Sequence, residues 1–335
     1  MAKKTLLVSR HLFTRMKSLK MLGEVRVEVG DKHEVEQKLA TLSAGGPSKL
    51  QLIVDFDYTM SRAHRNNQPV DCSWGVLENF PELPMCYTEK VEHECHTELL
   101  ETCLYQVKEL RSHYYPIELD PTLSVEEKTP HMAEVLLLII LLLLFYLLQW
   151  YTKANLALGE SQVKADWFPR MVDASNCELR DSTDVLLNTA NKSSVPFIIL
   201  SAGIGDLIRE ILSHHKLMLE NMRIVSNFLE FDSTTGVVVG LKSDMPIHMF
   251  NKKAPNQEGL QDRKNIILIG DSLGDVRMAD GIENINVVLS IGFLNKNVEA
   301  NLSEYKRCFD IVLVDDQTMD FPLALLEDIL EAKAH

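Results

Sequence analysis

Apolar positions follow two different patterns along the chain. Between about residues 89 and 190 they recur at helical spacing, as at positions 99, 100, 103, 104, 107 and 110. Short, mostly apolar runs lie on either side of that region, at positions 50–54, 196–200, 265–270, 287–291 and 311–314. Because such runs alternate with helical segments, they predict a parallel sheet covered by helices on both faces.

The order of these runs predicts the domain organisation. The first run lies before the helical region and the others follow it, so we expect an α/β core with a Rossmann-like parallel sheet and a helical cap inserted after the first core strand. The predicted limits are an N-terminal helical segment at 1–45, a core at 46–62 and 195–335, and a cap at 63–194. Since parallel sheets bind ligands at the carboxyl ends of their strands, residues that follow each run are the candidates for function.

One stretch of the predicted cap is unusually apolar. Residues 135–148 read VLLLIILLLLFYLL and contain no charge. The run is shorter than the roughly 20 residues that span a bilayer, and one crossing there would separate position 55 from positions 201–275. We therefore expect no transmembrane helix. The open alternatives are a buried cap helix, a hydrophobic contact with a protein or a membrane through 135–149, and an intron wrongly translated into the sequence.

Composition narrows the classes of function. The 335 residues include 48 acidic and 34 basic side chains, a net charge of −14, which argues against a protein that binds the phosphate backbone of nucleic acids. Six cysteines without a C-x-x-C pair indicate a reducing compartment, and we expect a cytoplasmic monomer. The first twenty residues are basic and contain no acid, which leaves a mitochondrial transit peptide as an alternative.

Polar residues at the ends of the predicted strands suggest phosphoryl chemistry. Asp55 and Asp57 follow the first run, separated by one aromatic residue. The carboxylate of Asp55 can attack a phosphate monoester, and Asp57 can protonate the leaving oxygen and then deprotonate the hydrolytic water. These two residues are the predicted catalytic pair.

Later strand ends offer groups that could hold the phosphate and a metal. Ser201, the backbone amides of Ala202 and Gly203, and Lys252 are the predicted phosphate ligands. The predicted Mg²⁺ ligands are carboxylates, which suit this hard cation: Asp55, Asp57, Asp271 and Asp275. A structural alternative is that Asp271 or Asp275 only caps the helix that follows.

In this order the four segments resemble the signature of the haloacid dehalogenase-like phosphatases. Residues 197–206, 248–252 and 269–281, and 114–118 and 126–132 in the cap, more closely resemble the cytosolic pyrimidine 5′-nucleotidase family, which includes the 7-methylguanosine phosphate-specific branch. The resemblance extends from about residue 39 to 330. It implies a Mg²⁺-dependent phosphoric monoester hydrolase that cleaves nucleoside 5′-monophosphates (CMP, UMP, 7-methyl-GMP) through an aspartyl-phosphate.

The resemblance also implies a site for the base. It places Glu118 where its carboxylate accepts a hydrogen bond from an exocyclic amino group, and Trp150 and Tyr151 where an aromatic ring stacks on the base. The choice between pyrimidine and 7-methylguanine stays open. Relatives continue from the counterpart of Glu134 almost directly to that of Trp150, whereas fifteen residues intervene here. There are two alternative functions: another small-molecule phosphatase of the same fold, and a non-catalytic membrane-associated homologue with a disrupted cap.

Overall fold

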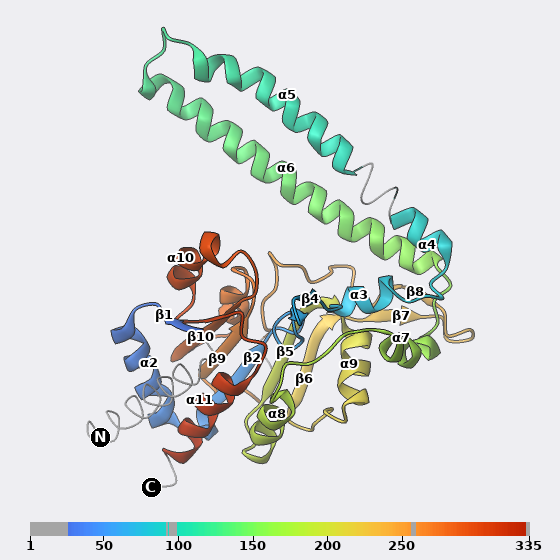
Figure 1. Ribbon diagram of the computed structural model, residues 1–335, viewed down its shortest axis with the longest axis vertical. Helices are drawn as coiled ribbons and strands as arrows, with labels where there is room; N and C mark the ends of the chain where they lie inside the picture. Colours follow the sequence, from blue (N-terminus) through green and yellow to red (C-terminus); the bar gives the residue numbers. More distant parts are fainter. Residues whose placement is uncertain (1–25, 92, 94–98, 256–258, 333–335) are drawn as a thin grey trace. The chain divides into compact units, whose positions relative to one another are not determined.

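The structure, a computed structural model, describes residues 26–91, 93, 99–255 and 259–332 (Figure 1). It forms two compact units. The first contains the residues up to Phe80, Phe168–Phe228 and those from Lys242 onward, and the second contains Pro81–Trp167 and Leu229–Leu241. The basic first twenty residues lie outside the described part of the chain.

The first unit is built on a seven-stranded sheet with the order β1-β11-β10-β9-β2-β5-β6. Neighbouring strands are parallel except β1 and β11, which pair antiparallel at one edge. The strands are β1 Arg26–Val29, β2 Leu50–Val54, β5 Phe197–Ile204, β6 Met222–Asn227, β9 Asn265–Gly270, β10 Val287–Leu294 and β11 Ile311–Val314. The predicted α/β fold with a mostly parallel sheet is therefore confirmed.

Strand β2 lies inside this sheet, between β9 and β5. All five of its residues, LQLIV, are buried, as expected for a strand of a parallel sheet covered on both faces, and the polar Gln51 donates to the carbonyl of Arg263. Its Val54 pairs with Ile269 of β9 on one side and Ile199 of β5 on the other. The carboxyl ends of β9, β2 and β5 consequently lie side by side at one edge.

Helices cover the sheet of the first unit (Figure 1). Helix α10 and the 3₁₀ helix at 275–281 pack on one face through alternate strand residues such as Ile53 and Leu268. Helix α2 contacts β9 and β10, α8 contacts β5, and α11 contacts both α2 and α8. The α-helices of this unit are α2 Lys32–Gly45, α3 Ser73–Glu78, α7 Phe168–Ala174, α8 Thr183–Lys192, α9 Gly205–His214, α10 Val298–Cys308 and α11 Asp320–Glu331. Two 3₁₀ helices lie at Pro47–Lys49 and Asp275–Gly281. Strands β3 His64–Arg65 and β4 Gln68–Pro69 form a separate two-stranded sheet.

The second unit is dominated by two long antiparallel helices. Its elements are α4 Met85–Lys90, α5 Leu99–Leu119, α6 Val125–Glu160, a 3₁₀ turn at Ala165–Trp167, β7 Leu229–Phe231 and β8 Val238–Leu241. Helix α6 begins with a capping box in which Ser124 and Glu127 satisfy each other's backbone amides. The β7–β8 hairpin packs on the C-terminal end of α6, where a Cβ at Gly159 would lie 2.9 Å from the carbonyl of Val239.

The units differ from the predicted division of the chain. Residues 63–80 and 168–194 were expected in the cap but belong to the first unit, because α3 and α7 pack on each other and on α9. Residues 229–241 were expected in the core but form the hairpin that packs on α6. The expected N-terminal helical segment contains a strand, because β1 completes the sheet and buries Val27.

The two long helices settle one alternative for the apolar run. Helix α5 continues past Pro116, which lies in its last turn, to Leu119. The apolar run lies in α6 and is not a buried cap helix, since 6% of its most apolar 18-residue window is buried. By length and composition α6 could cross a membrane.

Candidate active site

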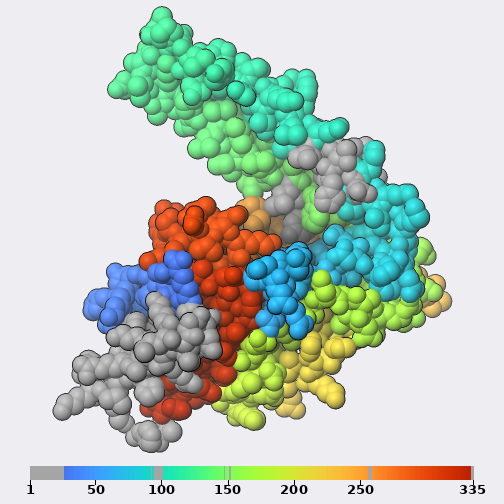
Figure 2. Space-filling model, viewed as in Figure 1, coloured from blue at the N-terminus to red at the C-terminus, as the bar shows by residue number. Residues whose placement is uncertain are grey.

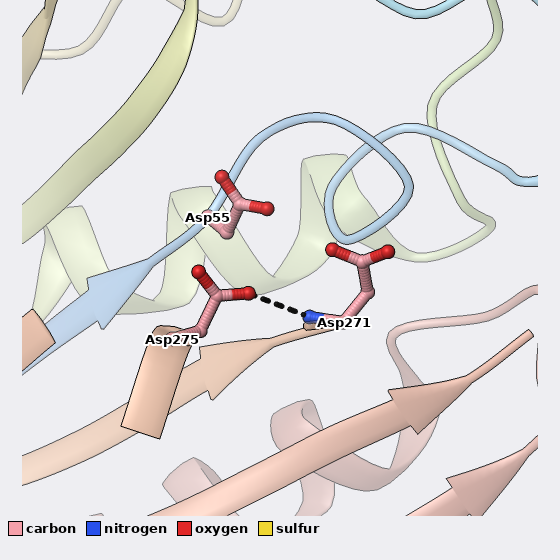
Figure 3. A group of neighbouring side chains, drawn as sticks. All are labelled: Asp55, Asp271 and Asp275. Atoms are coloured by element: carbon pink, nitrogen blue, oxygen red, sulfur yellow. Dashed lines mark hydrogen bonds between the residues drawn. The ribbon is translucent and has the colours of Figure 1, made fainter. Parts of the chain in front are cut away.

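Three carboxylates meet at the carboxyl edge of the sheet (Figure 3). Asp55 follows β2, and Asp271 and Asp275 follow the neighbouring strand β9. One oxygen from each lies within 4.8 Å of the others. Asp55 and Asp275 are buried, and Asp271 is half-buried. Buried oxygens this close repel one another unless a cation lies among them, so the donor set fits a divalent metal such as Mg²⁺.

Lys252 supplies positive charge to this cluster. Its Nζ lies 2.5 Å from Oδ1 of Asp55 and 2.8 Å from Oδ1 of Asp275. Burial by itself would lower the pKa of Lys252, but the two carboxylates raise it, so the ammonium is charged at neutral pH.

The pKa values of the clustered carboxylates Asp55 and Asp271 are raised as well. Burial raises the pKa of Asp55 to about 7, although Lys252 acts to lower it. Burial, together with the charges of Asp55 and Asp275, raises the pKa of Asp271 well above its ordinary value. Among the described side chains the cluster thus holds more negative charge than Lys252 compensates, and a divalent cation would remove that excess.

Asp275 is oriented by the main chain. Its Oδ2 accepts hydrogen bonds from the backbone N–H of Asp271 at 3.1 Å and of Ser272 at 2.9 Å, the first of which is drawn in Figure 3. Gly270 allows this approach, because a Cβ there would lie 2.4 Å from the Cβ of Asp275. The capping alternative is wrong, because the amides of Asp271 and Ser272 precede the 3₁₀ helix that begins at Asp275 and no side chain caps that helix. The other oxygen of Asp275 faces Lys252.

Asp57 lies apart from the three clustered acids. Its Oδ1 accepts from the backbone N–H of Ser73 at 2.6 Å, and its Oδ2 accepts from the Ser73 hydroxyl at 2.7 Å. The chain turns sharply at Tyr58, which has a φ of 59°, so the two aspartates of the motif point to different partners. The structure thus brings three of the four predicted metal ligands together and not the carboxylate of Asp57. Burial raises the pKa of Asp57, and the bonds from Ser73 act to lower it.

The end of β5 brings the predicted phosphate ligands beside Asp57. Ser201 is buried and its Oγ accepts from the backbone N–H of Gly203 at 3.0 Å; Ala202 between them is half-buried. A Cβ on Gly203 would lie 2.6 Å from Oδ2 of Asp57 and 2.0 Å from Oγ of Ser73. Only glycine fits there, which explains the close approach of the β5 end to Asp57.

Sequence reasoning missed Ser73 and also Arg180, which holds the loop after β2. The buried guanidinium of Arg180 donates to the carbonyls of Thr59 at 2.7 Å and Tyr58 at 2.6 Å, and to Oδ1 of Asn295 at 2.8 Å. It also bonds to the carbonyl of Asp316. Neither residue is close in sequence to Asp55 or Asp57, and no local motif signals either one.

The three predicted base-binding residues are not brought together. Glu118 is exposed near the end of α5, and its carbonyl accepts from the Lys128 ammonium at 2.9 Å. Trp150 is half-buried and lies 22 residues beyond Lys128 in the same helix, a separation of about 33 Å. The side chain of Tyr151 lies outside the described part of the structure. The cause is the apolar run, whose fifteen residues lengthen α6 by about 22 Å.

Known proteins are similar to this chain over most of its length. Residues 58–330 match the family described as pyrimidine 5′-nucleotidase (UMPH-1). The 7-methylguanosine phosphate-specific 5′-nucleotidase of Homo sapiens is 35% identical over 302 residues, covering 88% of this chain and 90% of the relative. The enzyme A of the same name from Xenopus laevis is 33% identical over 318 residues, covering 92% and 97%. The crystal structure of cytosolic 5′-nucleotidase IIIB bound to cytidine has a TM-score of 0.67 at 29% identity, covering 95% of this chain and 98% of that one.

The fold, the acid cluster and these relatives define a phosphatase-type hydrolase with 5′-nucleotidase activity. More narrowly, the chain belongs to the pyrimidine 5′-nucleotidase (UMPH-1) family. The family predicted from the sequence motifs is therefore confirmed.

Proposed function

We propose that this 5′-nucleotidase hydrolyses nucleoside 5′-monophosphates in a Mg²⁺-dependent reaction through an aspartyl-phosphate on Asp55. The observation that carries the proposal is the convergence of Asp55, Asp271 and Asp275 around the ammonium of Lys252. Such a site combines a nucleophile, hard oxygen ligands and a fixed positive charge within a few ångströms.

In the proposed reaction Asp55 is the nucleophile and Asp57 is the general acid and base. An oxygen of Asp55 bonds to phosphorus while the bond from phosphorus to the ribose O5′ breaks, and Asp57 gives its proton to that leaving oxygen. Water then attacks phosphorus, its proton passes to Asp57, and the bond to Asp55 breaks to release phosphate. Burial raises the pKa of Asp57, which favours the protonated form that the first step needs.

Other groups stabilise charge on the phosphoryl oxygens. Lys252, the hydroxyl of Ser201 and the backbone amides after it surround the position next to Asp55 and Asp57 in this proposal. Asp55, Asp271 and Asp275 would hold Mg²⁺, which when bound offsets the repulsion between an anionic nucleophile and a dianionic phosphate.

Relatives suggest the substrates. The curated relatives are named for 7-methylguanosine phosphate, and the similar solved structure holds cytidine. CMP, UMP and 7-methyl-GMP are therefore the proposed substrates. Relatives named cytosolic support a cytoplasmic location.

A second candidate is a phosphatase of the same core that does not read the base. The observation in its favour is the separation of about 33 Å between the positions of Glu118 and Trp150 along the hairpin. Ribose 5-phosphate, which has no base, distinguishes the two candidates when it is compared with the nucleotides.

The test is phosphate release from CMP, UMP, 7-methyl-GMP and ribose 5-phosphate, with and without Mg²⁺. We expect Mg²⁺-dependent release that Asp55→Asn abolishes and that Asp184→Asn, a change of an exposed aspartate in α8, leaves unchanged. A phosphorylated protein trapped by rapid quenching should be absent in Asp55→Asn. Absence of release by the folded chain from every nucleotide refutes the proposal, and so does a near-normal rate of Asp55→Asn.

A further inference from the structure

One surface helix of the first unit reaches the loop that carries two of the clustered acids. Helix α10 contains no fully buried residue, and Figure 2 shows it in orange-red at the surface of that unit. Its Tyr305 is half-buried, and the hydroxyl donates a hydrogen bond to the backbone carbonyl of Asp271 at 2.6 Å. This bond joins α10 to the loop after β9, on which Asp271 and Asp275 lie.

The carbonyl that accepts this bond belongs to the peptide unit between Asp271 and Ser272. The N–H of the same peptide unit donates to Oδ2 of Asp275 at 2.9 Å. Because the peptide bond is planar and trans, its C=O and its N–H point in opposite directions. Tyr305 and Asp275 therefore hold one rigid plane from its two sides, and that plane fixes Asp271 relative to Asp275.

The ring of Tyr305 is itself held in place. It stacks on Phe309, one helical turn further along α10, with ring centroids 5.6 Å apart and an interplanar angle of 29°. Phe309 is 2% exposed, and its ring lies so close to Gly292 of β10 that a Cβ there would come within 2.6 Å of it. The hydroxyl of Tyr305 therefore projects from a support that is anchored on the sheet.

The charge state of Tyr305 suits a permanent donor. Burial, together with the charges of Asp271 and Asp275, raises the pKa of Tyr305 to about 12, so the hydroxyl keeps its proton at neutral pH. A hydrogen bond to a peptide carbonyl polarises that peptide and strengthens the bond that its N–H donates. Tyr305 thus acts on the carboxylate of Asp275 through the peptide unit between Asp271 and Ser272.

We propose that Tyr305 is a positioning residue that fixes Asp271 and Asp275 for Mg²⁺ and makes the site select Mg²⁺ over Ca²⁺. The inference rests on the metal site of the proposed function. Mg²⁺ demands near-ideal octahedral geometry, whereas Ca²⁺ accepts six to eight oxygens in flexible arrangements. Loss of a bond that only orients the ligands therefore costs Mg²⁺ affinity more than Ca²⁺ affinity.

The experiment measures metal binding by the full chain directly. Free Mn²⁺, a probe that prefers the same octahedral oxygen sites, is followed by electron paramagnetic resonance, and Mg²⁺ and Ca²⁺ are titrated against bound Mn²⁺. Tyr305→Phe keeps the ring and removes only the hydroxyl. We expect it to raise the Kd for Mg²⁺ about tenfold, the lower end of what partners of metal ligands contribute, and the Kd for Ca²⁺ about threefold or less.

A matched control makes the same chemical change elsewhere in the chain. Tyr105→Phe alters a tyrosine of α5 that is 61% exposed, and it should leave both Kd values unchanged. Circular dichroism and urea titration check that both variants are folded.

Three results overturn the inference. The first is a Kd for Mg²⁺ that Tyr305→Phe leaves unchanged, and the second is an equal loss of Mg²⁺ and Ca²⁺ binding, which a purely structural role of the tyrosine predicts. In both cases the native chain binds metal, so the proposed function stands. The third is a native chain that binds none of the three ions, which refutes the Mg²⁺ dependence of the proposed function as well.

Discussion

Deleting residues 135–149 should bring Glu118 close enough to Trp150 and Tyr151 for all three to contact one bound base. In the full chain the position of Glu118 beside Lys128 and the position of Trp150 are about 33 Å apart along α6, more than one nucleobase can bridge. Deleting residues 135–149 leaves six residues between Lys128 and Trp150, a separation of seven positions and a rise of about 10 Å. The deletion therefore brings the three predicted base-binding residues within reach of one ligand.

The expected effect of Glu118→Ala differs between the two backgrounds. In the full chain we expect kcat/KM for CMP and 7-methyl-GMP to change less than twofold, because the carboxylate is too far away to read the base. In the deletion background the same substitution should remove a hydrogen bond to a charged group, about 1.5–3 kcal/mol, or roughly a 10- to 150-fold loss of kcat/KM.

The assay is steady-state phosphate release by all four proteins, with ribose 5-phosphate as the substrate that lacks a base. Glu101→Ala, which changes another exposed acid of α5, is the matched control and should be neutral in both backgrounds. Circular dichroism checks that the deletion variant folds. A tenfold loss caused by Glu118→Ala in the full chain, seen for nucleotides and not for ribose 5-phosphate, would refute the reasoning.

Three further predictions concern the first unit. Ser73→Ala removes one of the two bonds to Asp57, so kcat should fall about 10- to 100-fold with little change of KM, whereas Ser213→Ala, at an exposed serine of α9, should be neutral. Arg180→Gln breaks the bonds to the loop after β2 and should lower the free energy of unfolding by about 3 kcal/mol in urea titrations; an unchanged midpoint would contradict the role of Arg180. Asp271→Asn should raise the Mg²⁺ concentration for half-maximal activity by tenfold or more, and EDTA should abolish native activity reversibly; activity that survives EDTA would argue against the metal.

Much of the core could be predicted because buried parallel strands leave a direct trace in the sequence. The runs at 50–54 and 265–270 are mostly apolar, with Gln51 and Asn265 as exceptions, and acidic residues follow them, so Asp55, Asp271 and Asp275 could be assigned to one edge of the sheet. Lys252 also converges on this edge, although it does not directly follow a strand.

Residues whose contacts are distant in sequence could not be predicted, because no local sequence pattern marks them. Ser73 lies at the start of a short helix and Arg180 in a loop, and each finds its partners only once the chain has folded. The limits of the two units were missed for a similar reason, since the β7–β8 hairpin is local in sequence but packs on α6. The distance between Glu118 and Trp150 could not be predicted either, because it depends on the length of α6, which the resemblance to relatives does not determine.

The position of β2 between β9 and β5 has a consequence for synthesis of the protein on the ribosome. Val54 pairs with Ile269, which is translated 215 residues later, and with Ile199 of β5. At 5–20 residues per second, β2 waits on the order of 10 to 40 s for its second neighbour. Throughout that delay the apolar segment LQLIV has at least one unpaired edge, a template for aggregation. The strand that precedes Asp55 is therefore a segment of the nascent chain that stays prone to aggregation until β9 has been made.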